Sequence, residues 1–171
     1  MCSSDLSEEY LRVARRPVPH LERESLADLV REVVEFIKPE LSKANVSCEV
    51  EIDDALPAVA FDEAQIRQAL LNLIRNAREA TQPGGGRLWV RVRASSDGHG
   101  SGVDLVVDDD GSGIGDDLRD KVFDPFFTTK ERGTGLGLAV TRQIVEAHGG
   151  TISWESRKPR GTRFFVHLPQ V

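Results

Sequence analysis

The order of the predicted secondary structure restricts the fold of this chain more than any single motif does. From Val46 onward, the hydrophobic patterns predict a strand, a helix, two strands, two helices and two strands. A parallel doubly wound sheet needs strands and helices in strict alternation, so this order excludes it. The order favours an α+β sandwich, in which a mostly antiparallel sheet carries its helices on one face.

The longest predicted helix begins at Asp62, which can cap its first turn, with Gln65 reaching back to complete the cap. Phe61 can pack onto Ile66, and the helix stops at the sequence TQPGGG. The other predicted elements are a helix from Ser25, capped together with Asp28 and kinked near Pro39, a loop over 53–61, a short helix around 118–123, a helix from about 136 to 148 with Gly149 as its cap, and strands over 46–52, 87–94, 102–110, 151–156 and 162–169.

The composition excludes several classes of protein. The formal net charge of −6 argues against a general nucleic-acid binder, which grips phosphates with clustered Lys and Arg. The four His show no metal-ligand spacing, and the two scattered Cys form no disulfide framework, which favours a reducing compartment. No run of about 18 apolar residues is present to span a bilayer. We therefore expect a cytoplasmic domain, although its parent protein could carry a membrane anchor.

Two glycine clusters indicate a phosphate-binding region. The sequence DDDGSGIG (108–115) follows a predicted strand, and GTGLGLA (133–139) precedes a predicted helix. Glycine lets backbone amides approach a ligand closely, and a helix dipole adds positive potential at its first turn. Neither cluster fits the P-loop or the Gly-x-Gly-x-x-Gly dinucleotide pattern. Each cluster taken alone is equally well explained by ordinary loop and capping glycines.

A third feature is the pair Asn72 and Asn76 in the helix that begins at Asp62. Residues four apart lie on one helix face, with Cβ atoms about 5–6 Å apart. The rest of this face is Ala, Leu and Ile. Asn is a poor helix former, and a buried amide needs hydrogen-bond partners, so a chemical role would explain the pair.

Taken together, these features resemble a known family. The Asn-bearing helix, DDDGSGIG, VFDPFFTTK (122–130) and GTGLGLA occur in the order of the N, G1, F and G2 boxes of the ATP-binding domain of bacterial sensor histidine kinases. That domain belongs to the GHKL superfamily, with DNA gyrase, the Hsp90 chaperones and the mismatch-repair protein MutL. The resemblance covers roughly residues 21–171. It implies the Bergerat-type fold, a two-layer α/β sandwich of a mixed, mostly antiparallel five-stranded sheet with three helices on one face.

The resemblance also implies the ligands, ATP and Mg²⁺. Asn76 matches the position that coordinates Mg²⁺, a hard cation that takes few protein ligands. Asp109 matches the carboxylate that accepts a hydrogen bond from the adenine amino group. The other nucleotide-binding positions that the family pattern implies are Gly111, Gly113, Gly133, Thr134, Gly135, Leu136, Gly137, Leu138 and Thr162.

Between the two glycine clusters, about residues 116–134 resemble the flexible ATP lid of the family. Phe123, Phe126 and Phe127 would anchor the lid through apolar contacts, or they are simply core residues. Lys130 would contact the β- or γ-phosphate as a catalytic residue, or it is a solvated charge.

The residue type at position 72 distinguishes a kinase from a hydrolase within the family that the chain resembles. In the ATP-hydrolysing relatives, the residue four before the Mg²⁺ asparagine is a Glu that activates water. An amide has no basicity near neutral pH, and loss of such a base removes about 10²–10⁴ of rate. Slow attack by water favours transfer to a nucleophile that needs no base, such as a neutral histidine, through positioning and charge neutralisation. Asn72 would orient groups as a catalytic residue, or it is only a satisfied amide.

The chain departs from the family pattern at one position. Many kinases of the family carry a Lys three residues after the Mg²⁺ asparagine, where this chain has Glu79. Phosphate neutralisation would then fall to Lys130, Mg²⁺ and Arg132. Asp108 and Asp110 match no ligand, and we expect them to be exposed or strand-end residues.

No histidine of the chain resembles the phosphoacceptor of a dimerisation helix. Residues 1–20 resemble the end of the second dimerisation helix and its linker, and residues 21–171 the catalytic domain. We therefore expect the acceptor on the protein's own dimerisation domain, upstream of this chain, and a response regulator receiver domain as the downstream partner. We expect no nucleic-acid or membrane contact, a monomeric fragment and a homodimeric full-length protein.

The implied function is binding of Mg-ATP and transfer of the γ-phosphoryl group to a histidine. Two alternatives remain open. A GHKL-type ATPase would use ATP to drive a conformational cycle, and Asn72 argues against it. A catalytically silent nucleotide-binding or interaction module is opposed by Asn76, Asp109 and both glycine clusters.

Overall fold

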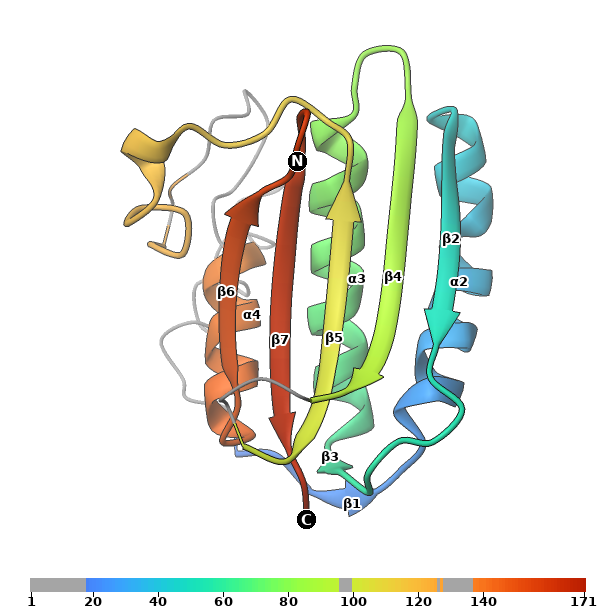
Figure 1. Cartoon of the computed structure of the whole chain (residues 1–171), viewed down its shortest axis with the longest axis vertical. Helices are drawn as coiled ribbons and strands as arrows, with labels where there is room; N and C mark the ends of the chain where they lie inside the picture. The colour runs from blue at the N-terminus through green and yellow to red at the C-terminus, as the bar shows by residue number, and fades with distance from the viewer. Residues whose placement is uncertain (1–17, 96–99, 126, 128–136) are drawn as a thin grey trace, which may run out of the picture.

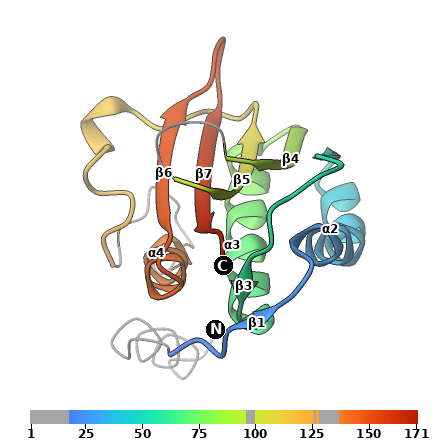
Figure 2. The same cartoon turned by 60° about the horizontal axis from the view of Figure 1, so that its bottom comes forward.

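The computed structural model describes residues 18–95, 100–125, 127 and 137–171. Its main sheet contains β2 (Val46–Ile52), β4 (Gly86–Ala94), β5 (Gly102–Asp109), β7 (Thr162–Pro169) and β6 (Thr151–Ser156), in that spatial order. The β2–β4 pair is parallel and the other three pairs are antiparallel. Helices α2 (Leu26–Lys43), α3 (Glu63–Ala80) and α4 (Gly137–Ala147) cover one face of this sheet (Figures 1 and 2). The predicted two-layer α+β sandwich is confirmed.

The core forms between the helices and the covered face of the sheet. Each helix turns one apolar face inward, as its sequence pattern predicts. Alternate residues of the central strands meet these helices, because strand side chains point to opposite faces in turn. The most deeply buried large side chains include Ile37, Leu41, Phe61, Ile66, Leu70, Leu73, Ile74, Leu88, Phe164 and Leu168.

The helix ends agree with most of the sequence predictions. Ser25 caps α2 by accepting a hydrogen bond from the Asp28 N–H at 3.2 Å. Gly149 ends α4 with a φ of 71°, a left-handed conformation that favours glycine. Pro39 lies inside α2 and does not end the helix, which continues to Lys43.

The predicted cap of α3 is half right. Asp62 accepts the Gln65 N–H at 3.1 Å, as expected. Gln65 does not reach back, because Nε2 of His148 accepts the Asp62 N–H at 3.0 Å and occupies that place. The Gln65 Oε1 atom has no hydrogen-bond partner among the described residues. The end of α4 is thereby joined to the start of α3.

Two short elements differ from the predictions. Instead of a helix over 118–123, the structure has a 3₁₀ helix, Asp116–Leu118, followed by single turns. The predicted loop over 53–61 ends in strand β3 (Ala60–Phe61), which pairs with β1 (Glu22–Arg23) in a second, two-stranded sheet. The expected helix at the N-terminus lies outside the described residues. Within the described ranges, no helix is long and apolar enough to cross a membrane.

Candidate functional site

The face of α3 that carries Asn72 and Asn76 contacts α4. Asn72 and Asn76 are half-buried and lie one turn apart on α3. The Asn72 Nδ2 donates to the carbonyl oxygen of Gly137 at 3.2 Å and to Oγ1 of Thr141 at 3.3 Å. Asn72 therefore holds the first turn of α4 against α3.

The C-terminal end of the same face of α3 contacts the loop after β5. Ala80 lies one turn beyond Asn76, and its carbonyl accepts the Ser112 N–H at 2.9 Å. A Cβ on Gly111 would lie 2.4 Å from that carbonyl oxygen, so only glycine permits the contact. Asn76 thus lies between the first turn of α4 and the first glycine cluster.

Asp109 ends β5 as a buried carboxylate, with 1% of its surface exposed. Its Oδ1 accepts the Gly111 N–H at 2.9 Å, and the backbone N–H of Thr162 also donates to it. Burial raises the pKa of Asp109 to about 6, with smaller increases from the charges of Asp110 and Asp108, although the two N–H donors act against this rise. The carboxylate is therefore ionised at neutral pH at some cost, with spare capacity to accept another donor.

Glycine also permits close backbone contact around Asp109. Gly161 has a φ of +117°, and a Cβ there would lie 1.9 Å from the Asp109 carbonyl oxygen. Gly113 has a φ of +80° and faces the Gly161 backbone, 3.5 Å from the position its own Cβ would take. The sequence analysis did not single out Gly161. The signal was its place immediately before Thr162 at the start of the last strand.

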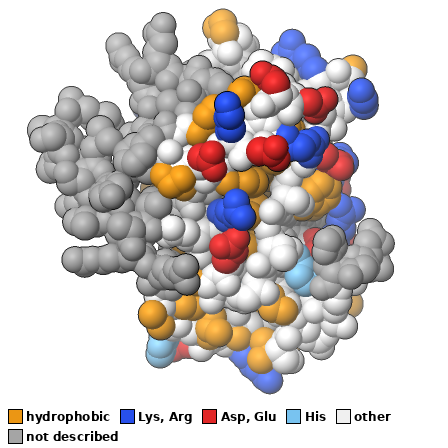
Figure 3. Space-filling view, turned by 90° about the vertical axis from the view of Figure 1, so that its left-hand side faces the viewer, with side chains coloured by type: hydrophobic (Ala, Val, Ile, Leu, Met, Phe, Trp, Pro, Cys, Tyr) orange, Lys and Arg blue, Asp and Glu red, His pale blue; other side chains and the backbone are white. Residues whose placement is uncertain are grey.

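The segment after the first glycine cluster is attached to the sheet and to α4. The Phe123 ring packs edge-to-face on Phe164, with centroids 6.3 Å apart, and the Arg142 guanidinium lies 5.7 Å from the Phe123 ring centre. Arg119 covers the ring of Trp154 on β6 at 4.6 Å. Figure 3 views the molecule from the side of β6 and shows hydrophobic patches there among acidic and basic side chains.

Other expected site residues are placed as follows. Leu138 is half-buried against the core, and Gly137 begins α4 in open space. Glu79 is exposed and lies 3.7 Å from Arg78. Phe127 is half-buried and packs on the core. The predictions for Phe126, Lys130, Arg132, Gly133, Thr134, Gly135 and Leu136 lie outside the described residues.

Asp108 lies at the end of β5, as one of the two expected alternatives has it, but the other alternative, an exposed side chain, is wrong. Its side chain is fully buried and forms ion pairs with Arg91 and Arg163 on the other face of the sheet. Asp110 is partly exposed, and its Oδ1 accepts the Arg87 N–H at 2.8 Å. Asp108 is buried because it occupies a central strand, where long arginines from both neighbouring strands cover it.

A polar hollow of about 570 Å³ opens near Asp110 but is not this site. It lies between the end of α2 and the starts of β2 and β4, and neither Asn76 nor Asp109 lines it. Its lining residues are Ser42, Asn45, Val46, Ser47, Gly84, Gly85, Gly86, Arg87 and Asp110. The candidate site residues Asn76 and Asp109 lie outside this hollow, so its size alone does not identify a function.

Comparison with known proteins identifies the family of the chain. Residues 61–171 match the family described as "Histidine kinase-, DNA gyrase B-, and HSP90-like ATPase". The chain belongs to this family. Membership in this histidine kinase-like ATPase family agrees with the expected ATP ligand.

The relatives of the chain within the histidine kinase-like ATPase family include sensor histidine kinases. It is 38% identical over 161 residues to the sensor histidine kinase ZraS of Escherichia coli (strain K12), covering 94% of this chain and 34% of that protein. The full-length ShkA structure in complex with AMPPNP has a TM-score of 0.82 at 27% identity, covering 96% of this chain and 35% of that one. The histidine kinase ThkA in complex with the response regulator protein TrrA has a TM-score of 0.78 at 31% identity, covering 98% and 47%. This chain spans about a fifth to two-fifths of the length of the curated relatives it matches.

Proposed function

We propose that this chain is the ATP-binding catalytic domain of a sensor histidine kinase, which transfers the γ-phosphoryl group of ATP to a histidine on a dimerisation domain. The observation that carries the proposal is the hydrogen bonding of Asn72. The Thr141 hydroxyl donates its proton to the Gly137 carbonyl at 2.8 Å, so towards Asn72 it can only accept. Asn72 therefore donates to both partners, and a carboxylate at position 72 would lose both bonds and be repelled by the Gly137 carbonyl, which can only accept.

This arrangement supports a kinase over a hydrolase. A carboxylate base at position 72 would be needed to activate water, and its absence leaves attack by water slow. A neutral histidine needs no such base, so placement of ATP is enough for transfer. Asn72 contributes by fixing the first turn of α4, where the second glycine cluster ends.

The nucleotide would lie between α3, α4 and the ends of β5 and β7. The adenine amino group would donate to Asp109, beside Thr162, and the backbone at Gly111 and Gly113 would contact the purine and ribose. The buried, hydrogen-bonded carboxylate fits this role, because it retains free acceptor positions. The positions proposed to hold the phosphates are Gly133, Thr134, Gly135, Leu136, Gly137, Leu138 and, as a catalytic residue, Lys130.

Asn76 would be the protein ligand of Mg²⁺. Its position supports this role, since this face of α3 places it between the Asn72–Gly137 contact and the Gly111 loop. An amide oxygen suits Mg²⁺, which takes few protein ligands and keeps several waters. When bound, Mg²⁺ would neutralise part of the phosphate charge.

The partners follow from the same proposal. The phosphoacceptor would be a histidine on the protein's own dimerisation domain, of which residues 1–20 would be the end of the second helix and the linker. The solved complex of ThkA with the response regulator protein TrrA supports a response regulator as the next partner. The catalytic domain, residues 21–171, would be monomeric alone and dimeric through that upstream domain.

The test separates three functions in one experiment. The chain is titrated with ATP with and without Mg²⁺, and labelled ATP is then supplied together with the histidine-bearing dimerisation domain of a sensor kinase. Binding followed by label on the added histidine supports the proposal. Rapid phosphate release without the acceptor would establish an ATPase instead, and absence of ATP binding a silent module.

An Asn76→Ala variant tests the metal assignment. It should lose most of the gain in ATP affinity that Mg²⁺ gives, because the amide ligand is gone. Glu63→Gln is the matched control, since Glu63 is exposed at the far end of α3. Equal Mg²⁺ dependence in both variants would contradict the role of Asn76.

A further inference from the structure

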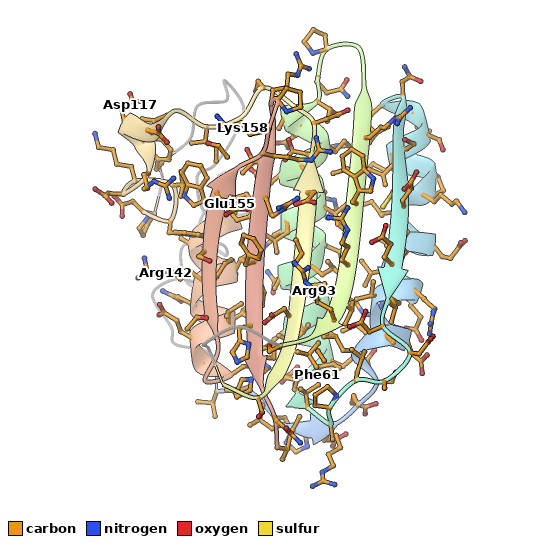
Figure 4. All side chains as sticks on the ribbon, viewed as in Figure 1. Phe61, Arg93, Asp117, Arg142, Glu155 and Lys158 are labelled. Carbon is orange, nitrogen blue, oxygen red and sulfur yellow. The ribbon has the colours of Figure 1, made fainter. Side chains whose placement is uncertain are left out.

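The helix-free face of the sheet carries a row of charges that no part of the proposed function uses. Figure 4 looks onto this face, with Glu155 and Arg93 labelled on it. Five charged residues of alternating sign cross the sheet, one from each strand in spatial order. These residues, which we call the charge ladder, are Glu51 on β2, Arg91 on β4, Asp108 on β5, Arg163 on β7 and Glu155 on β6.

Each member of the charge ladder contacts the next. Arg91 donates from Nε to Glu51 at 2.9 Å and from Nη1 to Oδ2 of Asp108. Arg163 binds both oxygens of Asp108, at 2.6 Å from Nε and 3.1 Å from Nη2. The same guanidinium reaches Glu155 at 3.2 Å through Nη1. Asp108 therefore receives three charge-assisted hydrogen bonds from two arginines.

Exposure decreases from the ends of the charge ladder to its centre. The exposed fractions of the side chains are 61% for Glu51, 26% for Arg91, 0% for Asp108, 31% for Arg163 and 52% for Glu155. Exposed ion pairs contribute little, whereas a buried charge is costly unless it is well paired. The central contacts of Asp108 therefore matter most.

The centre of the charge ladder lies directly behind the proposed adenine site. In the β5–β7 register, Asp109 is opposite Thr162, and Asp108 is opposite Arg163. Successive side chains of a strand point to opposite faces. The pair Asp109–Thr162 therefore faces the site, while the next pair along both strands carries the ion pair on the other face.

We propose that Arg163 and Arg91, acting through Asp108, are positioning residues for nucleotide binding, because they fix the end of β5 against β7 and offset the negative charge behind Asp109. This inference rests on the proposed function, in which Asp109 accepts the adenine amino group. The two arginines touch no ligand themselves. Their effect on binding passes through the backbone and the electric field at Asp109.

The field effect has a definite sign. The Asp108 charge raises the pKa of Asp109, after the larger effect of burial. An Arg163→Gln substitution removes one of two compensating charges, so Asp109 should bind its proton more tightly. An Asp108→Asn substitution removes the repelling charge, so Asp109 should bind its proton less tightly. A purely structural role of the charge ladder would not give opposite signs.

The experiment measures the ATP dissociation constant of each variant relative to wild type at pH 6 and pH 8. If Arg163→Gln raises the proton affinity of Asp109 about tenfold, binding weakens about fivefold at pH 6 and hardly changes at pH 8. Asp108→Asn should instead bind up to about twofold more tightly than wild type at pH 6, because it lets the half of Asp109 that is protonated there ionise. Arg93→Gln is the control. Arg93 lies on β4, two residues after Arg91 and on the same face of the sheet, but it is exposed and has no ion pair among the described residues.

Each result decides between the two proposals. If wild type binds no ATP at either pH, the proposed function is wrong. If wild type binds ATP but both ladder variants differ from it equally at pH 6 and pH 8, or match Arg93→Gln, the positioning role is wrong. If Arg163→Gln does not fold, the opposite shift expected of Asp108→Asn still tests the inference.

Discussion

Replacing Asp109 by Asn should stabilise the nucleotide-free domain at neutral pH while abolishing its affinity for ATP. The carboxylate is buried, and its pKa in the folded chain is about 6 against an ordinary value of 3.8. Between these two values the folded chain binds more protons than the unfolded chain. The stability of wild type therefore falls as the pH rises through this window.

The size of the effect follows from the two pKa values. Their difference of about two corresponds to about 3 kcal/mol of penalty for ionised Asp109 once the pH exceeds 6. Asn carries no charge and keeps an oxygen for the Gly111 N–H, so the variant does not pay this penalty. The gap in the free energy of unfolding, variant minus wild type, should grow by about 2.4 kcal/mol from pH 4 to pH 7, because part of the penalty is already present at pH 4.

Urea unfolding of both proteins across this pH range measures the gap. Only its change with pH matters, because any hydrogen bond that the uncharged amide fails to make shifts the gap equally at every pH. Asp110→Asn is the control, since the charge of this partly exposed carboxylate raises the pKa of Asp109 less than burial does, and its removal should reproduce only a small part of the gain. A gap that stays constant with pH, or that shrinks towards pH 7, would refute the reasoning.

Three further substitutions test contacts around the site and between α3 and α4. Gly161→Ala should cost more than about 2 kcal/mol of stability and remove ATP binding, because its Cβ would lie 1.9 Å from the Asp109 carbonyl oxygen. Gly113→Ala should cost only about 1 kcal/mol of stability, since the nearest atom lies 3.5 Å from the position of the added Cβ. Equal melting temperatures of the Gly161→Ala and Gly113→Ala variants would contradict this difference. His148→Phe should cost about 1–3 kcal/mol in urea unfolding, because the Asp62 N–H loses its acceptor, and an unchanged midpoint would argue against that bond.

The sequence predicted those features that local patterns determine. The caps at Ser25 and Asp62 and the stop at Gly149 depend on residues within a few positions of each other. The strand and helix layers follow from periodicities of two and of 3.6 residues. The proposed site residues Asn76 and Asp109 were found through ordered family motifs, not through any local rule.

The missed elements depend on contacts between distant parts of the chain. Val122 and Phe123 suggest the apolar face of a short helix, yet they pack on the core from a series of turns. The two-residue strands β1 and β3 are too short to show alternation, and each exists only through the other. Gln65 could complete a local cap, but His148, far along the sequence, accepts that N–H instead.

Asp108 shows how topology could have corrected the sequence interpretation. Within the run of three aspartates, the sequence alone does not distinguish Asp108 from Asp110. In the structure, β5 is the central strand, so residue 108 has a neighbouring strand on each side. A carboxylate there must be paired, because water cannot reach it. Once the strand order is known, the register places a basic residue in reach on both sides, Arg163 directly opposite and Arg91 on the diagonal. The burial of Asp108 thus follows from strand order and register together, and neither is contained in the local sequence.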